Sequence, residues 1–234
     1  NKIFTRGRKG NMAQLRKGMD EWEKYVRSFG FGSPLGIDLY GEKEGNVPDK
    51  REYDVYYGKN RWKWSTIFSI AIGQGEFLVT PLQMANLACV MANKGCYYQP
   101  HLVTKIGDKK IVFQDSLHRI ETLVDSIHFE IVHNGMQSVL EEDGGTARRS
   151  RIPSVTICGK TGTSQNPQGD DHSVFIAFAP RENPKIAIAV FVENAGGGGG
   201  TAAPIASLMI EKYLKKSVER KALELEMTKK VFFD

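Results

Sequence analysis

Apolar residues recur every three or four positions in several stretches of the chain, the spacing of one face of an α-helix. This pattern predicts a helix over residues 12–28, with an apolar face made of Leu15, Met19, Trp22, Tyr25 and Val26. It predicts a second helix over residues 125–141, with an apolar face made of Ile127, Ile131, Val132, Met136, Val139 and Leu140. A third helix is predicted from about Ala203 to Lys216.

Residues 80–83, Thr-Pro-Leu-Gln, carry the clearest helix start in the chain. Thr80 is a good N-cap, Pro81 suits the first helical position, and Gln83 completes a capping box. We predict a helix from Pro81 to about Asn93, ended by Gly95. Apolar residues occur on more than one side of this helix, which indicates burial on more than one side.

Three apolar stretches in the second half of the chain predict β-strands: VTICGKTGT, HSVFIAFAP and KIAIAVFVEN. The last two are joined by RENP, a turn of the length expected between antiparallel strands. Together with the helices, they predict an α/β fold in which an antiparallel sheet is flanked by helices. The five glycines at 196–200 predict a flexible connection from the last strand to the following helix.

The segments between these elements are richer in glycine, proline and aromatic residues. Residues 29–39 predict a turn and then a short extended piece at 37–39, and the aromatic residues 51–79 predict a loop-like segment. HLVTKI and KIVFQ, on either side of the turn GDKK, predict two short strands. The tail, residues 217–234, is charged and is predicted to be helical in part.

The composition of the chain argues against several kinds of binding site. The 234 residues are 41% apolar, enough for a packed core, and their net charge of +5 is spread along the chain. Because no RNA-recognition, zinc or helix-turn-helix pattern accompanies that charge, we predict no nucleic-acid partner. The three cysteines and five histidines show no C-x-x-C pair and no metal-ligand spacing, so we predict no disulfide framework, no metal and no cofactor. No stretch approaches the roughly 20 apolar residues that a membrane span needs.

Residues 158–164, CGKTGTS, hold a lysine between glycines and hydroxyl side chains. A phosphate-binding loop needs glycine at position 154, where the chain has Ser154, and a helix after the lysine, where the sequence predicts a strand. The glycine run at 196–200 likewise lacks the βαβ setting of a dinucleotide site. Two interpretations stay open at this point, a plain strand end with a solvated lysine and a lysine-threonine-glycine element for acyl transfer to a serine.

The acyl-transfer interpretation has a chemical basis. It needs a cation near the nucleophile, hydroxyls that hold a carboxylate, and a backbone N–H directed at the developing oxyanion. Lys160, Thr161 and Thr163 provide these groups, and Gly162 leaves room for a substrate backbone. Strand alternation predicts that Lys160 and Gly162 lie on one face of the strand and that Thr161 and Thr163 lie on the other.

Three separated stretches, in this order, resemble the transpeptidase domain of the monofunctional, class B penicillin-binding proteins, in particular the penicillin-binding protein 2 group. They are SFGFGSPLGIDL, IGQGEFLVTPLQMANLACVMANKG and GKTGTSQNPQGDDHSVFIAFAPRENPKIAIAVFVEN. The resemblance implies the serine β-lactamase and penicillin-binding-protein transpeptidase fold. It also implies a peptidoglycan D,D-transpeptidase that cross-links stem peptides through an acyl-serine and is acylated by β-lactam antibiotics.

The same resemblance implies a parent protein anchored in the bacterial inner membrane, with its catalytic domain in the periplasm and a membrane glycosyltransferase as partner. It assigns Lys160 to positive charge and proton contacts, Thr161 and Thr163 to the substrate or antibiotic carboxylate, and the Thr163 N–H to the oxyanion hole. Asp171 and His172 match a pair that is frequent in the group, and we expect their role to be structural.

The sequence departs from the family pattern in one respect. No serine is followed three positions later by lysine, and the S-x-N match at 164–166 directly follows the strand motif, so we interpret it as chance. We therefore expect the nucleophile element and the family's S-x-N to precede Asn1. Residues 1–216 would then be the C-terminal part of a transpeptidase domain, inactive alone, and residues 217–234 a charged tail. A penicillin-recognising sensor domain and a noncatalytic binding module are the alternatives.

Overall fold

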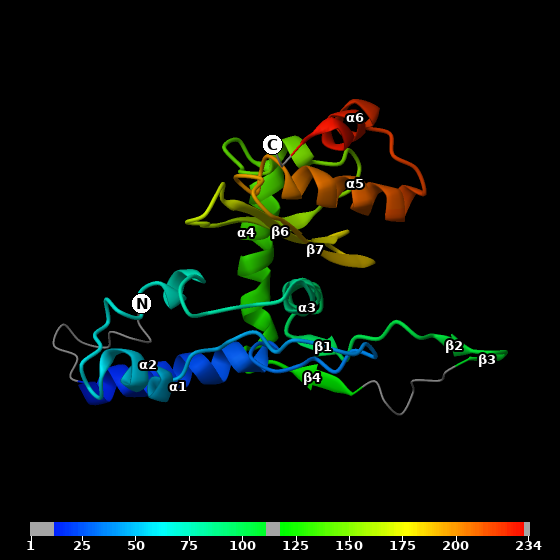
Figure 1. Ribbon diagram of the computed structural model, residues 1–234. Helices are drawn as coiled ribbons and strands as arrows, with labels where there is room; N and C mark the ends of the chain where they lie inside the picture. Colours follow the sequence, from blue (N-terminus) through cyan, green and yellow to red (C-terminus); the bar gives the residue numbers. More distant parts are fainter. Residues whose placement is uncertain (1–11, 111–117, 232–234) are drawn as a thin grey trace. The chain divides into compact units, whose positions relative to one another are not determined.

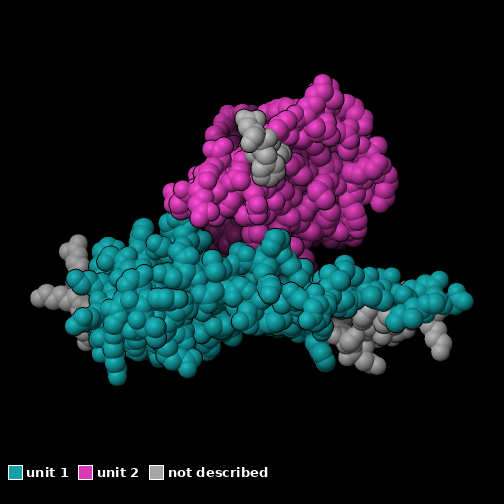
Figure 2. Space-filling view, viewed as in Figure 1, with its two compact units in different colours: residues 1–83, 98–123 teal, residues 84–97, 124–234 magenta. Residues whose placement is uncertain are grey.

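The computed structural model describes residues 12–110 and 118–231, which form two compact units (Figure 2). The first unit contains the chain up to Gln83 together with 98–123, and the second contains 84–97 and the chain from Val124 onward. The elements, labelled in Figure 1, are α1 (Met12–Ser28), α2 (Lys50–Tyr57), α3 (Pro81–Ala92), β1 (Cys96–Tyr98), β2 (Lys105–Ile106), β3 (Lys109–Lys110), β4 (Arg119–Glu121), α4 (Phe129–Glu141), β5 (Cys158–Ser164), β6 (His172–Ala179), β7 (Ile186–Val192), α5 (Ala202–Lys215) and α6 (Lys221–Lys229).

In the first unit, α1 has the predicted bounds, and Leu15 and Met19 on its apolar face are buried. The face is narrower than predicted, because Tyr25 is exposed. A bidentate ion pair joins α1 to α2, with the Arg16 guanidinium 2.7 and 2.9 Å from the two carboxylate oxygens of Asp54. The bonds from Arg16 and from the indole N–H of a buried tryptophan hold the pKa of Asp54 well below its usual range.

The prediction of a loop-like segment over 51–79 is wrong at its start, because α2 occupies residues 50–57. Asp49 is its N-cap, and the carboxylate accepts from the backbone N–H groups of Arg51 and Glu52 at 2.7 and 2.8 Å. Two of the aromatic residues that suggested a loop form hydrogen bonds to one carboxylate. Tyr53 and Tyr57 both donate to the carboxylate of Glu76, at 2.8 and 2.9 Å.

The predicted capping box of α3 is confirmed. The Thr80 N–H donates to Gln83 Oε1 at 3.0 Å, and the Gln83 N–H donates to Thr80 Oγ1 at 3.2 Å. The buried Gln83 amide also donates to the carbonyls of Gly30, Ser33 and Glu44, at 3.4, 3.2 and 2.9 Å. This side chain therefore links the first two of the three family-like stretches.

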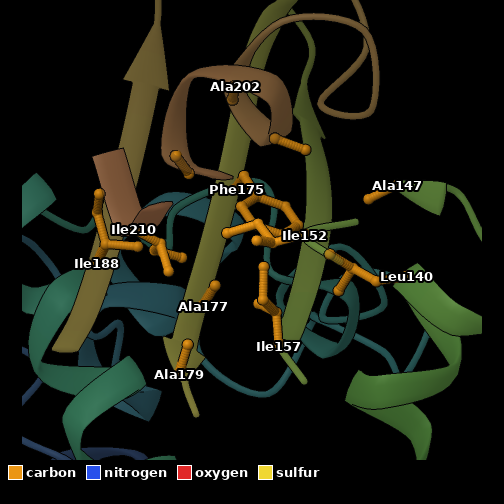
Figure 3. Close-up of a cluster of buried hydrophobic side chains, with 12 residues drawn as sticks. Leu140, Ala147, Ile152, Ile157, Phe175, Ala177, Ala179, Ile188, Ala202 and Ile210 are labelled. Carbon is orange, nitrogen blue, oxygen red and sulfur yellow. The ribbon is translucent and has the colours of Figure 1, made fainter. Parts of the chain in front are cut away.

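In the second unit, β5, β6 and β7 form an antiparallel sheet in that order, as predicted. Helix α5 covers one face of the sheet, and Figure 3 shows Phe175 near the centre of the core between them. The buried members of this core are Leu140, Ala147, Ile152, Ile157, Phe175, Ala177, Ala179, Ile188, Ala202, Ala203, Ala206 and Ile210. The small alanines of α5 allow its backbone to approach the sheet closely.

The apolar face predicted for α4 is confirmed at Met136 and Leu140, which are buried, and is wrong at its start. The helix begins at Phe129, after a 3-10 turn at 126–128, and Ile127 and Ile131 are 68% and 74% exposed. Its buried stripe is Phe129, His133, Met136 and Leu140. The imidazole Nε2 of His133, which the predicted apolar face does not include, lies 2.7 Å from the Met91 carbonyl, so this buried polar group has a partner.

Three smaller predictions have mixed outcomes. Residues 38 and 39 of the extended piece predicted at 37–39 lie in a bend. The hairpin of β2 and β3 confirms only the ends of the two strands predicted around GDKK, because 101–104 do not form a strand and 111–117 lie outside the described residues. The tail is helical in part, as predicted, because α6 occupies 221–229. Arg220 attaches this tail to α5 through the buried carboxylate of Glu211, at 3.0 Å.

Candidate active site

The candidate site is strand β5, which carries all four predicted site residues. Among the described strands, β5 has β6 as its one neighbour, so it is an edge strand of the sheet. An edge strand directs every second pair of its backbone N–H and C=O groups away from the sheet. This edge is where an extended ligand can add main-chain hydrogen bonds.

The predicted alternation along β5 is confirmed by its register with β6. Thr161 pairs with Phe175, a core residue on the α5 face of the sheet. Lys160 pairs with Ile176, one position along, and therefore lies on the other face. The two threonines share one face of β5, and Lys160 shares the opposite face with Gly162. The free edge of the strand separates the hydroxyls from the ammonium group.

The lysine bends back along its own strand. The Lys160 side chain is exposed, and its Nζ donates to the Thr161 carbonyl at 2.8 Å. This contact holds the ammonium group beside β5. A ligand along the edge of β5 would thus have the cation on one side and the hydroxyl groups on the other, an arrangement suited to a carboxylate.

Thr146 is a site residue that sequence reasoning missed. It lies in the loop after α4, and its Oγ1 is 2.7 Å from Thr161 Oγ1. The sequence predicts only a loop here, because a contact between residues 15 positions apart depends on the tertiary fold.

The glycine run connects β7 to α5, as predicted, and it packs against the back of the candidate site. A Cβ atom added at Gly198 would lie 2.3 Å from the Val174 carbonyl oxygen and 2.5 Å from that of Gly162. One added at Gly199 would lie 2.1 Å from the Thr146 carbonyl oxygen. Only glycine permits these backbone approaches. The sequence predicts the connection but not this packing.

The first two residues of β5 are buried. The Cys158 thiol donates to the His133 carbonyl at 3.6 Å, and burial raises the pKa of the thiol to about 11. A Cβ atom added at Gly159 would lie 2.4 Å from the Phe175 ring. Cys158 is therefore a core residue, and the strand is closely packed where it leads into the site.

Asp171 and His172 have structural contacts, as expected. The Asp171 carboxylate accepts from the Asn166 N–H at 3.2 Å. His172 Nδ1 accepts from the Asn194 N–H at 3.1 Å. The Asn166 amide donates to the Asn194 side chain at 2.7 Å, so the asparagine of the 164–166 match stabilises the loop between β5 and β6.

The sequence profile described as "Penicillin binding protein transpeptidase domain" matches residues 11–211. The chain belongs to the penicillin-binding protein transpeptidase domain family. The peptidoglycan D,D-transpeptidase MrdA of Haemophilus influenzae is 33% identical over 217 residues, which are 85% of this chain and 33% of that protein. The chain thus spans about a third of the length of this relative.

Solved structures support the same fold for the transpeptidase domain. Pseudomonas aeruginosa PBP2 in complex with WCK 5153 is 31% identical, with a TM-score of 0.75, over 90% of this chain and 46% of that one. The imipenem acyl-enzyme of penicillin-binding protein A from Mycobacterium tuberculosis is 28% identical, with a TM-score of 0.65, over 87% of this chain and 44% of that one.

Two further findings concern other kinds of site. No described helix is both long and apolar enough to cross a membrane. Within residues 12–110 and 118–231, no three His, Cys, Asp or Glu side chains gather where they could hold a metal ion.

Proposed function

We propose that this chain is the carboxylate-binding part of a peptidoglycan D,D-transpeptidase of cell-wall synthesis, which cross-links stem peptides through an acyl-serine intermediate and is acylated by β-lactams. The observation that carries the proposal is β5, an edge strand with Lys160 on one face and Thr161 and Thr163 on the other. Family membership, the name of the Haemophilus relative and the acyl-enzyme of the Mycobacterium protein support it.

Each residue of the motif has a role in the proposal. Lys160 supplies positive charge and proton contacts near the acylated serine. Thr161 and Thr163 donate to the carboxylate of the stem peptide or the antibiotic, and Gly162 lets the ligand backbone approach. The Thr163 N–H is one donor of the oxyanion hole, where a single donor contributes about 10²- to 10³-fold in rate.

The acylated serine comes, in this proposal, from a segment outside the chain, because no serine here is followed three positions later by lysine. Residues 1–216 are then the C-terminal part of the domain, and 217–234 a tail. A membrane anchor in the bacterial inner membrane, a periplasmic catalytic domain and a membrane glycosyltransferase partner belong to the same proposal. Their basis is the resemblance to the penicillin-binding protein 2 group.

The test uses the complete gene product that contains this chain. We expect a covalent adduct with a fluorescent penicillin, blocked by prior treatment with unlabelled penicillin. The chain alone should give no adduct, since it lacks the nucleophile element. Absence of an adduct on the complete protein would contradict the proposal, and labelling of the chain alone would contradict the assignment of the serine.

A second readout separates a transpeptidase from a penicillin-recognising sensor. A transpeptidase releases D-alanine when a donor stem pentapeptide acylates the serine, whereas a sensor is acylated by penicillin without this turnover. We expect D-alanine release from a pentapeptide donor with an acceptor stem present. Penicillin labelling without D-alanine release would favour the sensor, and neither reaction would favour the noncatalytic module.

A further inference from the structure

We propose that Thr146 is a positioning residue that directs the hydroxyl proton of Thr161 toward the ligand carboxylate, an inference that rests on the proposed function. Thr146 Oγ1 and Thr161 Oγ1 are 2.7 Å apart, the usual distance of a hydroxyl–hydroxyl hydrogen bond. Thr161 lies on the edge strand of the candidate site, whereas Thr146 lies in the loop after α4. Either hydroxyl could be the donor of this hydrogen bond.

The number of hydroxyl protons determines whether Thr161 can donate to a ligand. A threonine hydroxyl has one proton and two lone pairs, and only one proton can lie between the two oxygens. If Thr161 donates to Thr146, Thr161 has no proton left for an anion. If Thr146 donates, the Thr161 proton is free. Because a carboxylate only accepts hydrogen bonds, a bound carboxylate selects the arrangement in which Thr146 donates, and that bond also strengthens the donation by Thr161.

The backbone around Thr146 is held on two sides. The next residue, Ala147, is buried, and its N–H donates to the Val139 carbonyl of α4 at 3.0 Å. On the other side, Gly199 of the glycine run approaches the Thr146 carbonyl so closely that a Cβ atom would lie 2.1 Å from it. Helix α4 and the glycine run thus hold the backbone that directs the Thr146 hydroxyl toward Thr161.

The arrangement predicts an effect that is specific to the ligand carboxylate. Thr146 bonds to Thr161 on the threonine face of β5, whereas Lys160 lies on the opposite face. A variant that lacks the Thr146 hydroxyl should lose affinity for a free carboxylate. It should react almost normally with a ligand whose carboxylate is esterified, because the neutral ester is a much weaker acceptor for the Thr161 hydroxyl than a carboxylate.

The experiment measures acylation rates of the complete protein, by intact-protein mass spectrometry, with benzylpenicillin and with its methyl ester. For Thr146→Val, a change of nearly equal shape, we expect the rate with the free acid to fall about five- to tenfold. The rate with the ester should change less than about twofold. Thr146→Ser, which retains a hydroxyl, should behave as the unmodified protein.

A double-mutant cycle tests whether Thr146 acts through Thr161. In a Thr161→Val background, Thr146→Val should cause no further loss with the free acid, because the hydroxyl it orients is absent. Equal slowing of acid and ester by Thr146→Val would show a general structural role and overturn the inference, as would additive losses in the cycle. If the unmodified protein forms no adduct with either compound, the proposed function fails and the inference with it.

Discussion

The two halves of β5 differ in what surrounds them. Cys158 and Gly159 are buried among α4, β6 and the core, and a Cβ atom added at Gly159 would meet the Phe175 ring. From Lys160 to Ser164, the strand is exposed or half-buried and carries one ammonium and three hydroxyl groups. One continuous strand therefore has a buried half that fixes its position and a polar half that presents the chemistry. This difference implies that stability and ligand binding can be changed separately.

The largest expected effect comes from Lys160→Met in the polar half. We expect acylation by penicillin to slow about 10²- to 10³-fold, since a charged group near the reacting centre is lost. The free energy of unfolding should change by less than about 0.5 kcal/mol, because the side chain is exposed. Lys185→Met, at an exposed lysine just before β7, is the matched control and should leave acylation unchanged. A large loss of stability in Lys160→Met would contradict the claim that stability and ligand binding can be changed separately.

Substitutions in the glycine run behind β5 should lower the free energy of unfolding, as those in the buried half of the strand should. Gly198→Ala places a methyl group against two carbonyl oxygens, and we expect a loss of about 3 kcal/mol in the free energy of unfolding, measured by urea denaturation. Gly135→Ala in α4, where the added Cβ meets nothing within 4 Å, is the control. It should stabilise the protein by about 0.5–1 kcal/mol. Equal effects of the two substitutions would contradict the packing described for residue 198.

A smaller effect is expected in the buried half itself. Gly159→Ala directs a methyl group at a side-chain ring, that of Phe175, and not at two backbone oxygens as at residue 198, and we expect destabilisation of about 2 kcal/mol. Phe175→Leu should absorb part of this cost, so that the double variant is more stable than the sum of the single changes predicts. Simple additivity in urea denaturation would show that the ring is not the obstacle.

The smallest effect is a pH dependence of stability. Burial raises the pKa of the Cys158 thiol from its ordinary value of 9.0 to about 11, so the folded protein retains a proton that the unfolded chain loses. The stability that this thiol contributes is present below pH 9 and is lost as the pH rises toward 11. Cys158→Ala should therefore show a shallower decline over that range, whereas equal slopes would contradict the burial argument.

The sequence predicts those parts of the fold that depend on neighbouring residues. The capping box at Thr80 and Gln83, the three antiparallel strands and the alternation along β5 all follow from local patterns, and the structure has them. The failures have two kinds of cause. Helix α2 begins at a local cap, Asp49, that the aromatic pattern did not reveal, whereas the failure at α4 is tertiary. The buried face of α4 includes His133, a polar residue whose imidazole is satisfied by the distant Met91 carbonyl.

The candidate site divides in the same way. Lys160, Thr161, Gly162 and Thr163 are recognised from one short stretch of sequence. Thr146 and Gly198 are not, because their contacts join separate segments of the chain. A glycine run shows only that side chains are absent, and the structure is needed to show which backbone atoms occupy that space.

The most direct test of the account is a crystal structure of the complete protein acylated by benzylpenicillin. We predict that the penicillin carboxylate accepts hydrogen bonds from the Thr161 and Thr163 hydroxyls, at about 2.5–3.0 Å, with Thr146 still bonded to Thr161. The ammonium of Lys160 should lie on the other side of the ligand. A carboxylate held elsewhere, with both hydroxyls of β5 free of the ligand, would contradict the central claim that the polar half of β5 binds it.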